Sequence, residues 1–190
     1  KAVKPKLKGE AYYVRYADDF LIMFQYEADA ESVMNALADR LGKFSLEVAV
    51  EKTRILPFGR WKGTKEKFDF LGFTFYNTKT RTRKYRVGVM TSKKKLKAKR
   101  QAAKEWLRTR LTMPVVDTMR TLALVIKGHC NYYGVNGNFS SILKFWKYLK
   151  YATYRMLNRR DQKGRFKYGK FLRVWNYYIA EPHLTVNIWG

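Results

Sequence analysis

Two adjacent carboxylates, Asp18 and Asp19, stand between two short apolar segments of the sequence. Residues 12–16 alternate in character and residues 20–24 form a β-prone apolar run, so the pattern predicts a buried hairpin with the aspartates at its turn. Neighbouring carboxylates repel each other unless they are protonated or neutralised, and a hard divalent cation with oxygen ligands meets that need. The alternative is a turn in which the aspartates only reverse the chain.

The charge of the chain indicates an anionic partner. Its 190 residues carry 40 Lys and Arg against 15 Asp and Glu, a formal net charge of +25. Residues 1–90 contribute +7 and residues 91–190 contribute +18, so the second half is the stronger candidate for binding a polyanion. Nucleic acid fits better than a membrane, because the basic residues are spread over many segments and no uncharged apolar run of 18 residues occurs.

The sequence contains a single cysteine, Cys130. One cysteine excludes a disulfide within the chain and a zinc site built from its cysteines alone. We therefore expect a reducing compartment.

The first half of the chain predicts strands with one helix. Apolar residues recur at helical spacing from about residue 29 to residue 44, and Gly42 marks the end of the predicted helix. A loop and strand are expected over residues 46–56. A second hairpin is expected from the alternating residues 68–75 and 84–90.

The second half predicts helices. Apolar stripes indicate helices over residues 92–111, 115–133 and 139–158, joined by short links as in a small bundle. The tail from residue 159 is basic and aromatic and is expected to end in an extended segment, residues 184–189. The predicted fold class is α+β, with domains at residues 1–90 and 91–160 and a C-terminal extension at residues 161–190.

Several motifs resemble those of one family and occur in its order. Tyr16-Ala17-Asp18-Asp19 resembles the catalytic hairpin of reverse transcriptases, in the form carried by group II intron-encoded reverse transcriptase/maturases. Lys52-Thr53 is similar to the Lys-Thr pair of the next palm motif, and Phe70-Leu71-Gly72-Phe73 is similar to the primer grip. Gly128-His129-Cys130-Asn131-Tyr132-Tyr133 is similar to the Gly-x-x-Asn-Tyr-Tyr signature of the thumb, or domain X.

The resemblance implies the C-terminal part of an RNA-directed DNA polymerase, a partial palm followed by a three-helix thumb. It implies a two-metal Mg²⁺ site with Asp18 and Asp19 as ligands and as catalytic residues. The family supplies a third carboxylate from an upstream strand, yet Glu10 is the only acid before the hairpin and no pattern supports it. We therefore expect the chain alone to be inactive, and its site to be completed by the fingers and the remaining palm.

Other site residues follow from the resemblance, each with a structural alternative. Lys52 is a candidate proton donor to the leaving pyrophosphate, or else an exposed lysine that pairs with Glu51 or a phosphate. Tyr16 and Ala17 would lie beneath the primer terminus or the nucleotide, or else only pack in a strand. The resemblance also implies contacts with the primer for Phe70, Leu71 and Gly72.

Basic and aromatic residues of the predicted thumb are the candidate RNA contacts. Lysines crowd the start of its first helix, where the helix already carries positive partial charge, so bound phosphates explain them better than a solvated face does. The candidates in this and the next helix are Lys93, Lys94, Lys95, Lys97, Lys99, Arg100, Lys127, His129, Asn131, Tyr132 and Tyr133. Aromatic residues beyond Tyr133, including Trp146, Tyr151, Trp175, Tyr177 and Tyr178, either stack on unpaired bases or pack in the core.

The expected partners are intron or template RNA, an RNA–DNA template–primer duplex and deoxynucleoside triphosphates. Two rival functions remain: a maturase-like RNA-binding module without catalysis, and a small basic structural RNA-binding protein of the ribosomal kind. The aspartate pair distinguishes them from a polymerase, because paired acids beside bound phosphates would repel a polyanion.

Overall fold

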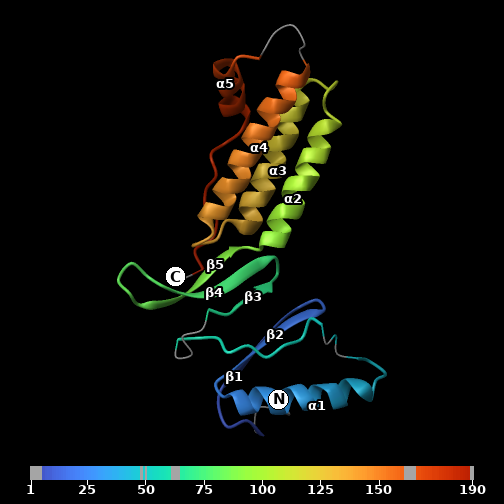
Figure 1. Cartoon of the computed structure of the whole chain (residues 1–190), viewed down its shortest axis with the longest axis vertical. Helices are drawn as coiled ribbons and strands as arrows, with labels where there is room; N and C mark the ends of the chain where they lie inside the picture. Colours follow the sequence, from blue (N-terminus) through green and yellow to red (C-terminus); the bar gives the residue numbers. More distant parts are fainter. Residues whose placement is uncertain (1–5, 48, 50, 61–64, 161–165, 189–190) are drawn as a thin grey trace. The chain divides into compact units, whose positions relative to one another are not determined.

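A hairpin and a helix come first along the chain, then a second group of strands, then four helices (Figure 1). The computed structural model describes residues 6–47, 49, 51–60, 65–160 and 166–188. The chain divides into one unit of residues 1–71 and 77–86 and a second of residues 72–76 and 87–190. The strands are β1 Ala11–Tyr16, β2 Asp19–Phe24, β3 Lys67–Phe70, β4 Phe73–Lys79 and β5 Tyr85–Thr91, and the helices are α1 Glu27–Gly42, α2 Lys93–Arg108, α3 Val115–Tyr133, α4 Phe139–Arg160 and α5 Tyr168–Tyr178.

The first hairpin confirms the strand pattern of the sequence. β1 and β2 pair antiparallel, from Ala11 opposite Phe24 to Tyr16 opposite Asp19. α1 packs against β2 and places Val33, Leu37 and Leu41 in half-buried positions. The expected burial of the hairpin is wrong for the structure as described, because every β1 residue after Ala11 is exposed.

Residues 46–56 do not form the expected strand. The described residues of this segment are irregular, with a turn at Glu51 and Lys52, whereas Val48 and Val50 lie outside the described residues. A strand pattern of alternating apolar residues therefore did not suffice to produce a strand here.

The pattern over residues 68–75 is split between two strands. Leu71 and Gly72 form the turn between β3 and β4, with positive φ values of 49° and 77°, as type I′ turns require. β5 then confirms the predicted strand at residues 84–90 within one residue, and the sheet has the order β3-β4-β5. Gly88 of β5 is needed beside Tyr76, because a Cβ there would lie 2.4 Å from the tyrosine ring.

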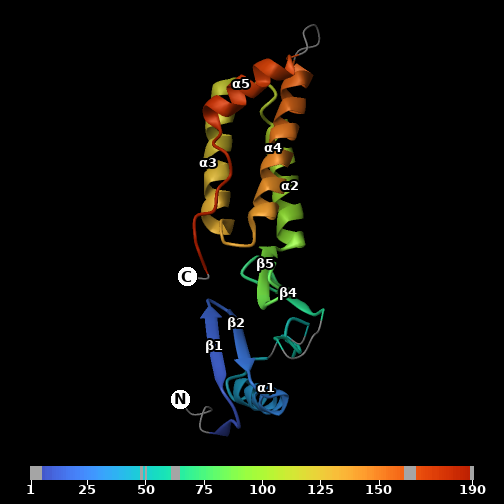
Figure 2. The ribbon, with the colours of Figure 1, turned by 90° about the vertical axis from the view of Figure 1, so that its left-hand side faces the viewer.

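Helices α2, α3 and α4 match the three predicted helices, and α3 has the predicted bounds. The bundle nevertheless contains a fourth helix, α5, which the sequence analysis placed in an extension outside it. α5 packs against α3 and α4 and crosses one end of them (Figure 2). No helix in the described part of the chain is both long and apolar enough to cross a membrane.

The core of the helical unit is drawn from all four helices. Phe145 and Leu149 of α4 and Phe171 and Trp175 of α5 are buried together. The remaining buried apolar members are Leu107, Met119, Leu122, Ile126, Cys130, Tyr133, Ile142, Met156, Leu157 and Ile179. Because α5 supplies two of the largest fully buried side chains, it belongs to the bundle and not to a separate tail.

The segment after α5 runs back along the bundle to the end of α3. The backbone N–H groups of Thr185 and Val186 both donate to the carbonyl of Gly134, at 2.7 and 2.9 Å. Gly134 has no room for a side chain, because a Cβ would lie 2.2 Å from the Cys130 carbonyl oxygen. A single parallel bridge pairs Val135 with Val186, so the predicted extended segment forms one bridge and no longer strand. Trp189, at its predicted end, lies outside the described residues.

One buried amide joins three elements of the helical unit. The Asn138 side chain accepts a hydrogen bond from the Thr91 backbone N–H at 2.7 Å. Its Nδ2 donates to Thr91 Oγ1 at 2.9 Å and to the Tyr133 carbonyl at 2.8 Å. Asn138 thus connects the end of β5 to the end of α3 at the start of α4.

We expect Asn138→Ala to lower the free energy of unfolding by about 2–4 kcal/mol, because the variant removes the partner of the buried Thr91 backbone N–H and one of the two hydrogen bonds to the Tyr133 carbonyl. Urea unfolding followed by tryptophan fluorescence measures this change. Asn131→Ala, on the exposed face of α3, is the matched control and should not lower stability. Equal midpoints for the two variants would contradict the assigned role of Asn138.

Candidate catalytic hairpin and nucleic-acid interface

The aspartates lie at a two-residue turn. Ala17 and Asp18 form the turn, and Asp19 is the first residue of β2, opposite Tyr16. Ala17 has a φ of 50°, in the left-handed region that a small side chain enters at less cost than a β-branched one. The Arg15 Nε donates to the Ala17 carbonyl at 2.8 Å. The sequence therefore places both carboxylates at the tip of a hairpin whose backbone is held by a neighbouring side chain.

Both carboxylates are exposed to solvent. Within the residues that the structure describes, no group of three metal-binding side chains occurs. The donor set of Asp18 and Asp19 fits Mg²⁺ in kind, since this ion prefers oxygen ligands and is commonly held by one or two carboxylates together with substrate phosphates. The pair can hold part of a metal shell, and the remaining ligands must come from other groups.

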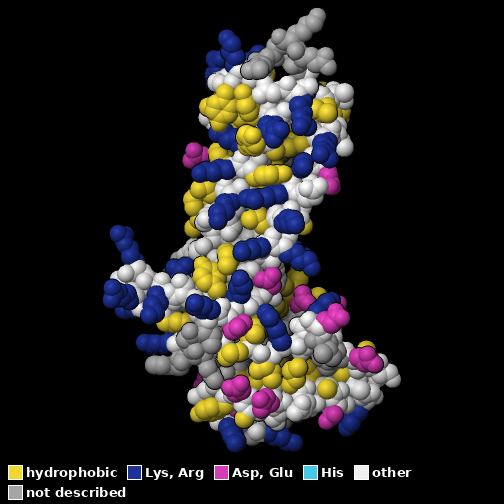
Figure 3. Space-filling view, viewed as in Figure 1, with side chains coloured by type: hydrophobic (Ala, Val, Ile, Leu, Met, Phe, Trp, Pro, Cys, Tyr) yellow, Lys and Arg dark blue, Asp and Glu magenta, His cyan; other side chains and the backbone are white. Residues whose placement is uncertain are grey.

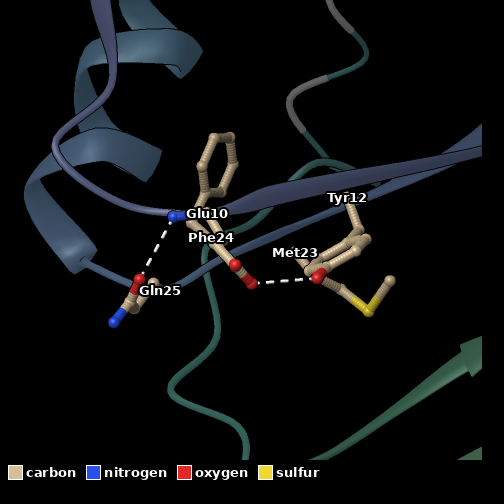
Figure 4. A pocket seen from close by; sticks show the side chains of 5 residues that line it. All are labelled: Glu10, Tyr12, Met23, Phe24 and Gln25. Carbon is tan, nitrogen blue, oxygen red and sulfur yellow. Dashed lines mark hydrogen bonds between the residues drawn. The ribbon is translucent and has the colours of Figure 1, made fainter. Parts of the chain in front are cut away.

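Glu10 is too far from the turn to complete that shell. β1 is six residues long, which separates its two ends by roughly 20 Å at about 3.3 Å per residue. At the far end Glu10 accepts a hydrogen bond from the Tyr12 hydroxyl at 2.9 Å, and its backbone N–H donates to Gln25 at 3.1 Å (Figure 4). The hydrogen bond and the negative charge of Glu10 raise the pKa of Tyr12.

A hollow of about 440 Å³ opens beside this end of the hairpin. Its lining contains Glu10, Tyr12, Met23, Phe24 and Gln25 (Figure 4). Only one of these side chains, Glu10, is acidic, so the described lining contains no second pair of carboxylates.

Asp29 is a structural residue that the sequence analysis did not single out. Its carboxylate is buried in the first turn of α1 and accepts hydrogen bonds from the backbone N–H groups of Lys8 and Gly9, at 3.1 and 3.0 Å. These bonds fix the segment that enters β1. An acid in a predicted first helical turn is a common sequence feature, and nothing in the sequence indicated this partner.

The other predicted palm residues come from three separate segments of the chain: the first hairpin, the irregular segment around Lys52 and the β3–β4 turn. Lys52 is exposed in an irregular segment, and no described contact joins it to Asp18 or Asp19. Tyr16 is exposed beside the turn, whereas Phe70 is half-buried at the end of β3. Leu71 and Gly72 form the β3–β4 turn, and a Cβ at Gly72 would lie 2.8 Å from the Tyr133 hydroxyl. Gly72 thus has a packing role, and its contact with a primer stays a prediction.

The predicted basic cluster of α2 has two parts. Lys93, Lys94, Lys95 and Lys97 are exposed in the first turns, where the helix has no acidic residue. Lys99 and Arg100 are half-buried over aromatic rings: the Lys99 ammonium lies 5.8 Å from the Tyr133 ring and the Arg100 guanidinium 5.2 Å from that of Tyr148. The first part is available to phosphates, and the second also packs the bundle.

A groove of about 340 Å³ lies between α2 and α4. Its lining is basic and aromatic, from Lys93, Leu96, Lys97, Arg100, Gln101 and Tyr148. Arg100 is held there by a hydrogen bond from its Nη2 to the Lys144 carbonyl, at 3.2 Å. Lys and Arg side chains gather along this face of the helices (Figure 3). The sequence missed the contribution of Tyr148, because only folding brings α4 beside α2.

Two of the predicted RNA contacts on α3 require correction. His129 is 1% exposed and Tyr133 8%, and the His129 ring lies 4.3 Å from that of Phe145 and 4.8 Å from that of Tyr133. Their rings pack in the core and are not available to a polynucleotide. Lys127, Asn131 and Tyr132 are exposed as predicted, with Tyr132 stacked on Phe73 at 5.9 Å and 11°. Their contact with RNA stays a prediction.

The core around His129 disfavours positive charge. Burial, and next the neighbouring Lys99, lower the pKa of His129 to about 4. Burial also lowers the pKa of Lys99 and raises that of Cys130. Among the residues that the structure describes, neither ring nitrogen of His129 has a hydrogen-bond partner. His129 is therefore neutral at pH 7 and has neither the exposure nor the partners of an acid–base catalyst.

The site consists of an exposed pair of carboxylates on a hairpin, in a chain with a strongly basic helical unit. A family model described as reverse transcriptase (RNA-dependent DNA polymerase) matches residues 1–75. The match includes β1, β2, α1 and β3 and ends within β4. No curated protein matches the chain. The first hairpin thus lies within a match to reverse transcriptases, and the mixed fold with antiparallel hairpins is compatible with part of a palm.

The stability of the helical unit should fall as the pH decreases from about 6.5 to about 4. His129 is protonated in the unfolded chain below its ordinary pKa of 6.5, while the folded state resists protonation down to about 4. The free energy of unfolding should drop by on the order of 2 kcal/mol across that range. Denaturant unfolding of the protein and of His129→Gln at pH 7 and pH 4.5 measures the difference. A variant that keeps the whole pH dependence would contradict this assignment.

Proposed function

We propose that the chain is part of an RNA-directed DNA polymerase of the group II intron reverse transcriptase/maturase kind. The observation that carries the proposal is the pair Asp18 and Asp19 at a fixed hairpin turn, within the residues that match the reverse transcriptase model. Paired carboxylates are costly beside a polyanion unless metal ions neutralise them. Their presence in a chain of net charge +25 therefore favours a polymerase over a simple binding protein.

Asp18 and Asp19 would hold Mg²⁺ at the tip of the hairpin. When bound, a pair of such ions activates the primer 3′-hydroxyl and stabilises the leaving pyrophosphate. The hydrogen bond from Arg15 to the Ala17 carbonyl orients the turn that carries the carboxylates. Ala17 leaves room for a backbone or sugar beside them. Lys52 remains the proposed donor of a proton to pyrophosphate, a role that requires it to approach the turn.

The described residues supply only two carboxylates at this turn, so a third must come from elsewhere. We expect the chain by itself not to extend a primer, because the loss of a metal ligand removes several kcal/mol of transition-state stabilisation. The fingers and the remaining palm of the polymerase are the partners that would complete the site.

The helical unit would grip the RNA. The exposed lysines at the start of α2 and the groove between α2 and α4 combine positive charge with Tyr148, as surfaces that bind polynucleotides do. In a maturase, this grip would serve both the template–primer duplex and the intron RNA during splicing. A reducing compartment, the bacterial cytoplasm or an organelle, follows from the single cysteine and the family resemblance.

A second candidate function is RNA binding without catalysis. The observation that favours it is the separation of the acids: Glu10 lies at the opposite end of the hairpin from Asp18 and Asp19. A maturase-like module would keep the basic helical unit and need no complete metal site.

Replacement of Asp18 and Asp19 by Asn should abolish binding of a divalent cation at the turn. With Mn²⁺ as a paramagnetic probe, the amide signals of residues 16–20 should broaden in the unaltered chain and stay sharp in the double variant. In the polymerase that contains this chain, the same replacement should abolish primer extension and leave RNA affinity unchanged or raised. Glu10→Gln, at the far end of β1, is the matched control and should alter neither result. Unchanged primer extension in the double variant would refute the catalytic role.

Replacement of Lys93, Lys94 and Lys95 by Ala should flatten the salt dependence of RNA binding. Each phosphate contact that is lost should reduce the slope of log K against log salt by about one unit or less. Fluorescence anisotropy over a series of KCl concentrations measures that slope. A variant with Lys43, Lys65 and Lys67 replaced by Ala loses the same charge from exposed positions of the first unit. Equal slopes for both variants would show that the α2 lysines are a solvated face.

A further inference from the structure

The exposed face of α5 carries cations and a tyrosine in one line. Lys170, Arg173 and Tyr177 follow one another at i, i+3 and i+7, a spacing that places them on the same side of a helix. All three are exposed, whereas Phe171 and Trp175 on the opposite side are buried in the core. The outer face of α5 therefore lies away from the buried core, with the Lys170 ammonium 5.5 Å from the ring of Phe166.

Tyr177 is the most exposed of the large apolar residues in the described chain, at 82%. Its ring makes an edge contact with that of Tyr178, at 4.9 Å and 80°. Tyr178 is half-buried and packs against the core. Tyr177 is thus supported from one side and open to solvent over most of its ring.

The charges on α5 are not balanced within the helix. The helix contains no acidic residue, and Lys167 and Lys170 lie at its N-terminal end. Positive side chains are unfavourable at that end, because the helix dipole is positive there. A ligand with negative charge would remove this cost.

We propose that the outer face of α5 binds single-stranded RNA, with an unpaired base stacked on Tyr177 and the flanking phosphates held by Lys170 and Arg173. Aromatic side chains stack on any exposed base, and neighbouring cations follow the backbone of a single strand. A duplex offers no free base to Tyr177, because its bases are already stacked in pairs. The inference rests on the proposed nucleic-acid function for its class of ligand and adds a second binding surface.

This surface lies apart from the groove between α2 and α4. Trp146 contacts α5, through its ring against Trp175 and its Nε1 hydrogen bond to the Ala180 carbonyl at 3.2 Å. Tyr148 contacts Arg100 of α2. Residues two apart lie on nearly opposite sides of a helix, so α5 and α2 flank α4 from different sides (Figure 1). One RNA can therefore engage the groove with a duplex and α5 with an adjoining single strand.

The test measures anisotropy of a labelled 12-nucleotide oligouridine and of a 12-base-pair RNA duplex with the complete chain. Tyr177→Ala should weaken oligouridine binding by about tenfold, as expected for the loss of one stacked base, and leave duplex binding unchanged. Tyr177→Phe should retain wild-type affinity, because it keeps the ring. Leu124→Ala, which truncates an apolar side chain of α3 that is 71% exposed, is the control and should have no effect. Circular dichroism confirms that each variant is folded.

Three outcomes would overturn the inference. The first is equal oligouridine affinity for Tyr177→Ala and the unaltered chain, and the second is an equal loss with the duplex. The third is Tyr177-dependent binding to vesicles that contain phosphatidylserine without such binding to oligouridine, which would assign the face to a membrane. Failure of the nucleic-acid binding on which the inference rests looks different, because the unaltered chain would then bind neither RNA.

Discussion

The helical unit depends on the hydrogen bonds of one buried side chain, Asn138. Its amide satisfies backbone or hydroxyl groups of Thr91 and Tyr133 and so holds the last residues of β5 against the end of α3. A buried amide is favourable only when its donors and acceptors are paired, which restricts the geometry at this junction to one arrangement. The start of α2 follows directly after Thr91. The basic surface of α2 therefore has a defined direction relative to α3 and α4 because Asn138 has its partners.

The cationic side chains of this unit differ in whether they cover aromatic rings of the core. Lys99 and Arg100 cover the rings of Tyr133, Phe145 and Tyr148, where their stems add to packing. The lysines of the first turn of α2 are exposed, whereas on α5 the Lys170 ammonium lies 5.5 Å from the ring of Phe166. A chain with a net charge of +25 tolerates the repulsion among these side chains more easily when a polyanion is bound. His129 is neutral first because it is buried, and next because the half-buried Lys99 lies beside it; both lower its pKa.

The sequence predicted those elements whose pattern is local. The hairpin around Asp18 and Asp19 and the bounds of α3 followed from periodicity and from turn and cap residues. It missed the turn at Leu71 and Gly72, because alternation continues across it and the positive φ of Leu71 has no signature in the sequence. α5 was missed although Phe171, Trp175 and Ile179 recur every four residues, since aromatic side chains serve equally in a core and on a surface. The position of the aspartate pair at a hairpin turn was likewise predictable from the sequence. The burial of His129 was not, because it depends on contacts between helices.

The segment after α5 affects when the helical unit can finish folding during synthesis. The Thr185 backbone N–H donates to the Gly134 carbonyl, across 51 residues of sequence, and the single proton of its hydroxyl is shared between the carbonyls of Cys130 and Gly134. These carbonyls end α3 and have no helical partner of their own. During synthesis these carbonyls can accept hydrogen bonds only from water or from other groups until residue 185 has left the ribosome. The helical unit is thus completed only after residue 185 has been synthesised, 51 residues after Gly134, a contact separation typical of slow folding steps.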